Sequence, residues 1–454
     1  MSPQPSATQP PEAHVYADVV IVGAGVAGLA AARHLTRAGL RPVVLEAAGG
    51  IGGRMSTEKV DGFRLDRIGQ LLCTSYPELR HTPGLDGLVL RPFAPGVLVH
   101  SEGRRHRAGE PTTSRRARGA LSAARALASA PVRPAASGPR SAAPGPRAAR
   151  RRARPARRDT ARPAPHPART PHRPGPVGPR HAVQDALRFR PSAPVGAALR
   201  PGPDDVQPVR RSRPARVRGG RLAVPEGGAD ALPELLAAGL PAASVRTGVR
   251  VTAVAANSVT TAEHGRLTCR SVLLATDAVA AAELLPGLRV PDFHPVTVVH
   301  HAVPEPPLTE PALLLDADRA GPVAHTSVIS QVDPTRAPAG RALVSSTVLG
   351  PPPGEHELRA QLAALYGTST AAWETLAVHH DARAVPTMPA PHDPRRPVRL
   401  LDGLYVCGDH RDTSTVQGAL HSGRRAARAV LADLGLPLVA PAPTAAGAPA
   451  SEAA

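Results

Sequence analysis

The chain has 454 residues, which is enough for a two-domain enzyme or for two or three smaller domains. It carries 55 Lys and Arg residues against 36 Asp and Glu residues, and its three cysteines exclude a disulfide-stapled secreted scaffold and show no paired spacing for a metal site. No run of 18 or more apolar residues is present, so we expect no membrane-spanning helix and a reducing, cytoplasmic setting.

The two ends of the sequence differ in composition from the rest. Residues 1–17 are rich in Pro, Gln and Ser, and residues 437–454 are rich in Pro and Ala. Both compositions predict disordered tails.

A βαβ unit is predicted from Asp18 to Glu46. Val19–Val22 is predicted to form a short buried strand, a helical stretch extends to about Arg37, and Pro42–Leu45 is predicted to be a second strand. The loop between the first strand and the helix has the sequence GAGVAG, which is the GxGxxG spacing of dinucleotide-binding loops.

Each part of this loop has a predicted role toward a dinucleotide. Gly23 permits the tight turn, Gly25 lets the backbone approach a pyrophosphate, and Gly28 lets the helix pack on the strand. The helix N-terminus, at Val26 and Ala27, faces the diphosphate charge.

An acidic residue completes the unit. Glu46 ends the second strand, where its carboxylate can accept hydrogen bonds from an adenosine ribose. A glycine-rich turn in a core is the alternative interpretation, but it gives no reason for Glu46.

A second glycine-rich element follows directly. Ala47 begins a run that contains Gly52, Gly53 and Arg54, whose backbone amides and guanidinium suit a second approach to the diphosphate. Asp61–Asp66 is then predicted to be a hairpin. A plain nicotinamide-dependent dehydrogenase is disfavoured, because those folds do not follow the acid with this element.

With GAGVAG, EAAGGIGGR and DGFRLD in this order, the chain resembles the flavin amine oxidase superfamily, which also includes protoporphyrinogen oxidase-like and phytoene desaturase-like enzymes. The resemblance covers about residues 18–131 and 221–436. It implies FAD as the cofactor and an α/β fold: an FAD-binding Rossmann-like domain of the two-dinucleotide-binding-domain type, with a discontinuous α+β substrate domain.

The last part of the chain resembles the C-terminal flavin motif of the same superfamily. Leu401–Asp409 is predicted to be a strand that runs into a loop, and a helix follows to about Leu434. By the resemblance, the ribityl or diphosphate region would meet Gly408 and Asp409, although a simple turn is the alternative for these two residues. The pyrimidine edge of the isoalloxazine would face the backbone of Gln417, Gly418 and Ala419.

Three middle segments agree with the resemblance in order and spacing. Arg221–Pro233 resembles a P-x-GG-x-x-x-L element that precedes a helix. Ser244–Val254 resembles the strand that meets the adenine, with Val251 as the contact, and Ser271–Thr276 resembles the strand that returns to the cofactor domain. Each segment alone could be any buried strand or turn.

The stretch Val132–Gly219 does not match the superfamily. Its 88 residues contain 21 Arg, no Lys, four Asp and no Glu, a net charge of +17, whereas the other 366 residues have a net charge of +2. Three interpretations remain open: an arginine-rich arm that binds nucleic acid or another anion, a disordered Pro/Arg linker, or a segment read outside its native frame.

The third interpretation can be tested on the sequence. Codons permitted for residues 203–220, read one base later, can encode PTTSSRFADRVLRAFAA, an amphipathic helix behind a Thr/Ser cap. Resequencing the gene across codons 125–225 would show whether this stretch is read in its native frame.

The predicted domains are discontinuous. The FAD-binding domain comprises residues 18–76, 221–283 and 390–436, and the substrate domain comprises residues 77–131 and 284–389. Residues 132–219 form the low-complexity or out-of-frame segment.

The resemblance implies hydride transfer to flavin N5 from a C–N or C–C bond of a small or apolar substrate, with oxygen or another acceptor taking the electrons. No catalytic residue and no metal site are predicted, because this chemistry depends on positioning more than on a nucleophile. The pairs His300–His301 and His379–His380 are predicted to be structural, and Pro386–Pro389 is weighed as a substrate-side loop. Cys407 is predicted to lie near the flavin without a covalent bond to it.

Two other functional hypotheses remain. One is an inactive or poorly folded FAD-binding relative with a garbled substrate domain, and the other is a basic-arm protein that binds nucleic acid or another anion. No DNA partner is expected, and peripheral contact with a membrane and the oligomeric state are left open.

Overall fold

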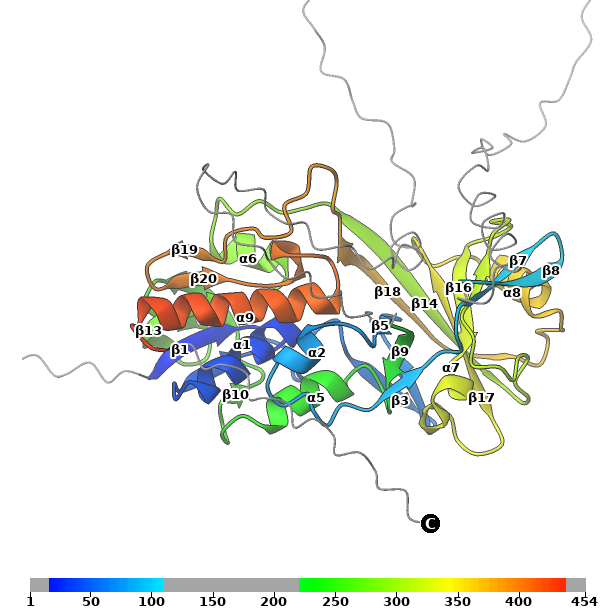
Figure 1. Cartoon of the computed structure of the whole chain (residues 1–454), viewed down its shortest axis with the longest axis horizontal. Helices are drawn as coiled ribbons and strands as arrows, with labels where there is room; N and C mark the ends of the chain where they lie inside the picture. Colours follow the sequence, from blue (N-terminus) through cyan, green and yellow to red (C-terminus); the bar gives the residue numbers. More distant parts are fainter. Residues whose placement is uncertain (1–15, 110–219, 438–454) are drawn as a thin grey trace, which may run out of the picture.

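The structure is a computed structural model that describes residues 16–109 and 220–437 (Figure 1). The expected N-terminal tail, the expected C-terminal tail and the Arg/Pro-rich stretch 132–219 lie almost wholly outside the described residues.

A largely parallel sheet forms the first half of the molecule. Its central strand, β1 (Ala17–Val22), is almost fully buried, and the apolar run Val19–Val22 within it is typical of a strand covered on both faces. The parallel strands run in the order β10 (Val245–Arg246), β2 (Pro42–Leu45), β1, β13 (Gly265–Leu274) and β20 (Leu404–Val406).

The strand β13 pairs with two different groups of strands. Its second half pairs with β1 and β20, whereas its first half joins an antiparallel meander with β11 (Val251–Ala255) and β12 (Ser258–Thr261). A short strand, β19 (Arg399–Leu401), pairs with β20 at the edge.

Two helices pack side by side on this sheet. They are α1 (Val26–Arg37) and α9 (Val416–Asp433), which Figure 1 shows in blue and red. Gly423 permits their close contact, because a Cβ there would lie 2.4 Å from the carbonyl oxygen of Ala27. The first and last parts of the described chain therefore form one core.

An antiparallel-rich sheet of seven strands forms the second half. Its order is β18 (Glu374–Pro386), β14 (Phe293–Val303), β17 (Ala342–Val348), β16 (Val323–Val328), β15 (Leu314–Asp316), β7 (Val97–Ser101) and β8 (Arg104–Ala108). The helix α8 (Glu355–Tyr366) buries Leu358, Leu362 and Leu365 in the same core as strand residues of this sheet.

Smaller elements complete the described part of the fold. They are the hairpin β3 (Thr57–Val60) and β4 (Phe63–Asp66), the three-stranded sheet β5 (Leu72–Cys73), β9 (Leu222–Pro225) and β6 (Leu90–Pro92), and the helices α2 (Glu78–His81), α5 (Ala231–Ala238), α6 (Ala278–Leu284) and α7 (Ile329–Val332).

A buried arginine ties these elements together. Arg336, 1% exposed, donates to the Asp66 carboxylate at 2.9 and 2.6 Å and to Asp333 at 3.2 Å. Asp333 also accepts from the backbone N–H of Gly227, and Asp66 from that of Ala229. One cation thus stabilises two buried carboxylates from separate segments.

The α/β fold class predicted from the sequence is confirmed. The βαβ unit, the hairpin at Asp61–Asp66 and the C-terminal strand and helix are present. One expected element differs: Ser244–Val254 forms two strands, β10 and β11, because Gly248 between them adopts a positive φ of 74° that interrupts extended pairing.

Candidate functional site

A cavity of about 970 Å³ lies at the carboxyl ends of the parallel strands and extends to the edge strand β18 of the second sheet. This is the position at which open α/β sheets bind their ligands, and the volume lies within the usual range of ligand sites. Of the residues predicted to hold the cofactor, these line the cavity: Gly23, Gly25, Val26, Ala27, Glu46, Ala47, Gly52, Gly53, Arg54, Val251, Gly408, Asp409 and Ala419.

The first glycine loop opens into this cavity. Gly23 has a φ of 107°, and a Cβ there would lie 3.0 Å from the backbone of Ala275. Gly25 is different, because no other described part of the chain, apart from its neighbours and the backbone of α1, lies within 4 Å of the position of its Cβ. The backbone at Gly25 therefore leaves room for a ligand to approach.

Gly28 does not line the cavity. A Cβ at this position would lie 2.2 Å from the carbonyl oxygen of Gly23 and 3.0 Å from the Cβ of Ala275. Its place is the contact between helix α1 and the sheet.

Glu46 holds the loop on its other side. Its carboxylate accepts from the backbone N–H of Ala24 at 2.8 Å and from that of Ala48 at 2.9 Å. These bonds orient the carboxylate at the cavity wall and brace the glycine loop at the same time.

The second glycine pair lies against the first loop. Gly52 donates its N–H to the carbonyl of Ala24 at 2.9 Å, and Gly53 has a left-handed φ of 58°. The Cβ of a side chain at Gly52 would lie 2.5 Å from the carbonyl oxygen of Met55. Both glycines are thus required by the local backbone as well as by the cavity.

Arg54 forms an ion pair with Asp409. The guanidinium lies 2.7 Å from the Asp409 carboxylate and also donates to the carbonyl of Ala384 at 2.6 Å. Burial opposes the charge of Arg54, but Asp409 and the more distant Asp381 and Asp277 more than offset burial, so the pKa of Arg54 is raised. The two charges predicted to meet the cofactor therefore neutralise each other in part.

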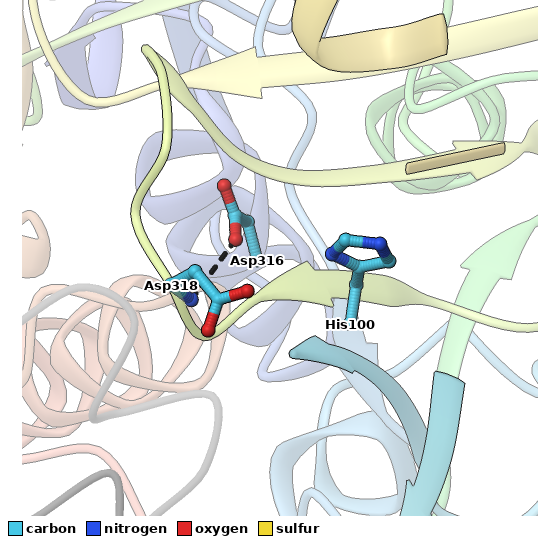
Figure 2. Close-up of side chains that lie close together, drawn as sticks. All are labelled: His100, Asp316 and Asp318. Carbon is cyan, nitrogen blue, oxygen red and sulfur yellow. Dashed lines mark hydrogen bonds between the residues drawn. The ribbon is translucent and has the colours of Figure 1, made fainter. Parts of the chain in front are cut away.

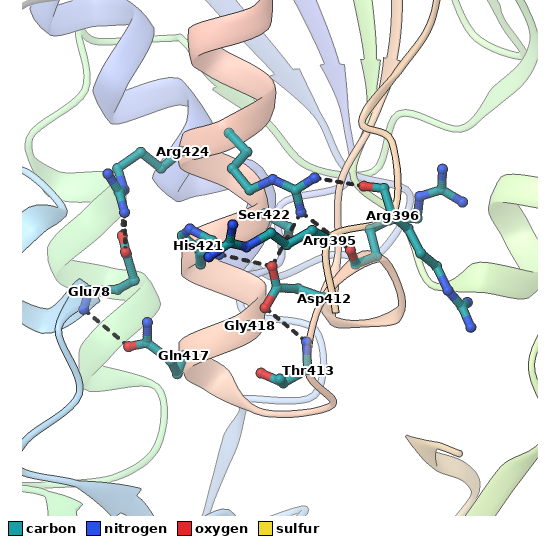
Figure 3. A network of polar contacts seen from close by, with 12 residues as sticks. Glu78, Arg395, Arg396, Asp412, Thr413, Gln417, Gly418, His421, Ser422 and Arg424 are labelled. Atoms are coloured by element: carbon teal, nitrogen blue, oxygen red, sulfur yellow. Dashed lines mark hydrogen bonds and ion pairs between the residues drawn. The ribbon is translucent and has the colours of Figure 1, made fainter. Parts of the chain in front are cut away.

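Gln417 and Gly418 are directed elsewhere. The Gln417 side-chain oxygen accepts from the backbone N–H of Glu78 at 3.0 Å, and the N–H of Gly418 donates to the Thr415 hydroxyl, which caps α9. Figure 3 shows Gln417 and Arg424 reaching from α9 to Glu78. Of the three predicted α9 residues, Ala419 lines the cavity, together with Val416 and Thr415.

The loop before α9 is held by a separate carboxylate. Asp412 accepts from His421 at 2.8 Å and from the N–H of Thr413 at 2.9 Å (Figure 3). It also accepts from Arg425 at 3.3 Å. These contacts fix the segment between Asp409 and the helix.

Sequence reasoning missed the far end of the cavity. There the wall comes from Arg67, Ile68 and Gln70 after β4, and from Val378, His379, His380, Asp381 and Arg383 on β18. No motif marks these residues, since β18 reaches the site by pairing with β14. The adjacent pair His379–His380 was the available signal, and it was interpreted as structural.

His300 and His379 lie on facing strands. Their rings are 5.6 Å apart at 69°, and His300 is fixed by the Ser345 hydroxyl at 2.9 Å and the Asp66 carbonyl at 3.0 Å. Burial lowers the pKa of His300 to about 4. His300 is therefore a neutral structural residue at neutral pH.

Cys407 and the Pro386–Pro389 loop are not among the cavity-lining residues. Cys407 is fully buried, and burial raises the pKa of its thiol to about 12. The loop instead holds Ser414, whose hydroxyl donates to the Pro386 carbonyl at 2.6 Å.

A second polar cluster lies in the other sheet. His100, Asp316 and Asp318 lie close together where β7 meets β15 (Figure 2). Asp316 accepts from the backbone of the turn and from Gln361 at 2.6 Å, and Asp318 accepts from Ser101 and Glu102. These carboxylates are already engaged in building the turn, so we assign the cluster a structural role.

Comparison with known proteins identifies the family. Residues 26–431 match the family of flavin containing amine oxidoreductases. The chain belongs to this family. The match begins at the N-terminus of α1 and includes strands of both sheets, the second glycine element and the C-terminal segment that line the cavity.

Curated relatives match over a short stretch. The family members include a pseudooxynicotine dehydrogenase from Pseudomonas sp, 39% identical over 70 residues, and a putrescine oxidase from Kocuria rosea, 47% identical over 68 residues. Each match spans 15% of this chain and 14% of the relative.

Solved structures share the fold along most of the chain. Cyclohexylamine oxidase from Brevibacterium oxydans IH-35A has a TM-score of 0.57 at 17% identity, and the match covers 92% of this chain and 99% of that one. Putrescine oxidase bound to putrescine has a TM-score of 0.52 at 18% identity, with the same coverage.

The cavity fits the flavin of this family, and FAD is the cofactor. The open backbone at Gly25 and the α1 N-terminus suit the diphosphate, and Glu46, at the end of the second strand and in the cavity wall, suits a ribose. None of the helices among the described residues is long and apolar enough to cross a bilayer.

Proposed function

We propose that the chain is an FAD-dependent oxidoreductase that oxidises a C–N bond of a small amine, with oxygen or another acceptor taking the electrons. The observation that carries the proposal is one continuous cavity, lined at one end by the two glycine loops and at the other by polar side chains of β18. The names of the matching relatives, a putrescine oxidase among them, support an amine over a hydrocarbon.

Different residues along the cavity would bind different parts of FAD. Glu46 and Val251 would hold the adenosine end, Gly25 and Gly52 the diphosphate, and the Arg54–Asp409 pair the region beyond it. When bound, the flavin supplies a hydride acceptor. The chain's own task is then to orient the substrate carbon toward it and to exclude water.

The mixed charges at the far end suit a polar substrate better than a polyene. Arg67, Gln70, His380 and Asp381 line this end beside the apolar Ile68 and Val378. We further propose a cytoplasmic location, which the free state of Cys73, Cys269 and Cys407 supports.

The proposal is tested by anaerobic mixing of the FAD-loaded full chain with a panel of primary and secondary amines, a porphyrinogen and a polyene. Loss of the flavin's visible absorbance with an amine alone is the expected result. Loss of absorbance with the porphyrinogen or the polyene, and with no amine, would contradict it. A chain that binds FAD and responds to none of the three classes would favour an inactive relative.

A further inference from the structure

His380 lies at the substrate end of the cavity on the edge strand β18. Its side chain is exposed and is among those that line the cavity. In the register of the sheet, His380 lies directly opposite Thr297 of β14. Thr297 is fully buried, so the inner side of the imidazole is anchored to the core.

The hydrogen bonds around Thr297 assign the proton positions on His380. The Thr297 hydroxyl lies 2.7 Å from the carbonyl oxygen of Gly350 and 2.9 Å from Nδ1 of His380. A carbonyl can only accept, so the single hydroxyl proton goes to Gly350, and Thr297 accepts from Nδ1–H. Nε2 of the neutral ring then carries a free lone pair.

An amine substrate needs a group that can accept a proton from its nitrogen. Most alkylamines are ammonium ions at neutral pH, and an ammonium cannot lose a hydride from its α-carbon readily because the nitrogen has no lone pair to stabilise the cation that forms. The excess proton must leave before the C–H bond breaks.

The described residues that line the cavity include no Phe, Tyr or Trp, so cation–π contact with the amine does not come from these residues. The remaining polar groups at this end include Asp381, whose Oδ1 accepts from the N–H of Arg383 at 2.7 Å.

We propose that Nε2 of His380 binds the amino group of the substrate and takes its excess proton, with Asp381 attracting the ammonium ion. This inference rests on the proposed function. The step is R₂CH–NH₃⁺ plus neutral His380 giving R₂CH–NH₂ plus His380–H⁺, and the Thr297–Gly350 chain keeps Nδ1–H in place throughout. His380 is thus the catalytic base, and Thr297 is a positioning residue.

Other charged or titratable groups face the same end. Arg67 comes from the loop after β4, Glu58 from β3, Arg54 from the second glycine element, and His379, Asp381 and Arg383 from β18. His379 differs from His380 in its setting. Burial lowers the pKa of His379, and its Nε2 is buried with Glu58 3.7 Å away.

The first test measures binding without turnover. Cumylamine and tert-butylamine have no α-hydrogen and cannot be oxidised, so their dissociation constants with the FAD-loaded full chain can be measured from pH 5 to 8. The wild-type Kd should weaken about tenfold or more toward pH 5, because a ring that already carries a proton on Nε2 cannot take the proton of the ammonium ion. In His380→Gln this pH dependence should fall to about twofold or less.

The second test uses the best oxidised amine of the panel. The anaerobic rate of flavin reduction should fall about tenfold or more in His380→Gln at pH 7.5. It should recover as the pH approaches the pKa of the amine itself, because the neutral amine is then supplied by solution. Thr297→Val should move the pH at which the Kd changes away from that of the wild type, because Nδ1 loses its hydrogen-bond acceptor.

His356→Gln is the control, because His356 is exposed on α8 and does not line the cavity, so this variant should keep the pH dependence of the wild type. If His380→Gln binds FAD and has the same pH profiles as the wild type for the Kd and for flavin reduction, the role of His380 is overturned. The proposed substrate class is not overturned by this result. If no amine reduces the flavin of the wild type, the proposed substrate class is overturned instead.

Discussion

Arg54 and Asp409 come from opposite ends of the described chain and form an ion pair of 2.7 Å in the cavity wall. The second glycine element and the C-terminal strand end are thereby joined by one contact. Asp409 is buried and Arg54 is partly exposed, so the pair holds together the two segments that we propose to bind the flavin.

The Arg54–Asp409 pair predicts that a variant of Asp409 binds FAD more weakly. Asp409→Asn removes the charge that holds Arg54 in place, and we expect the affinity for FAD to fall about tenfold or more, since a charge-assisted hydrogen bond is worth about 1.5–3 kcal/mol. Equilibrium titration of the apoprotein with FAD measures this. Asp402→Asn is the control, because Asp402 also pairs with an arginine but is 91% exposed. Equal affinities for the two variants would contradict the assigned role.

The Arg336 cluster predicts a large effect on stability. Arg336→Met leaves Asp66 and Asp333 buried without their cation, so the free energy of unfolding should fall by about 3–5 kcal/mol. Denaturant unfolding of the variant measures this loss. Arg41→Met, which removes an arginine that is 79% exposed in its pair with Asp18, should cost less than about 1 kcal/mol.

The same cluster has a pH signature. Burial opposes the charge of Asp66, but Arg336 and the surrounding hydrogen bonds more than offset it, so the pKa of Asp66 is lowered. Because its folded pKa is lowered, the Asp66 carboxylate stabilises the fold at pH values above its unfolded pKa of about 3.9. This stabilisation is lost as the pH falls through the folded pKa. Wild-type stability should therefore decline below about pH 4. In Arg336→Met the lowering of the Asp66 pKa should be lost, and an unchanged acid profile would contradict this.

Replacing His301 is predicted to raise the free energy of unfolding. Both of its ring nitrogens are buried without a hydrogen-bond partner among the described residues, and burial lowers its pKa to about 4. The unfolded chain then binds the proton more tightly, so this histidine lowers stability as the pH falls from about 6.5, by up to about 1.4 kcal/mol per pH unit.

His301→Leu should therefore raise the free energy of unfolding, and by more at pH 5 than at pH 7.5. Denaturant unfolding at the two pH values tests this. His356→Gln, an exposed change on α8, should leave the pH dependence as it is. A loss of stability at pH 5 in His301→Leu would show that the imidazole is needed where it lies.

The parts of the site that the sequence could predict are those with local signals. The strand at Val19–Val22, the spacing of Gly23, Gly25 and Gly28, and the acid at Glu46 lie within one βαβ unit, where periodicity and glycine spacing determine the geometry. The family resemblance extended this to Asp409 and the last helix.

The rest depended on packing at long range. His380 reaches the cavity through the register of β18 on β14, which no local pattern predicts. Gln417 lies in the first turn of α9 and is turned toward Glu78, because the contact of α9 with α1 and α2 decides which face is free. A motif can place a helix, but tertiary packing decides which of its residues face the ligand.

The most direct test of the account is the FAD content of the purified full chain beside that of Gly25→Asp. The new side chain fits the fold, since nothing lies within 4 Å of the Gly25 Cβ position, but its carboxylate would face the cofactor diphosphate. Gly49→Asp is the matched control, because its Cβ position is equally open and it does not line the cavity. The account predicts about one FAD per chain for the wild type and for Gly49→Asp, and none for a folded Gly25→Asp. Equal FAD content in all three would show that the glycine loop does not hold the cofactor.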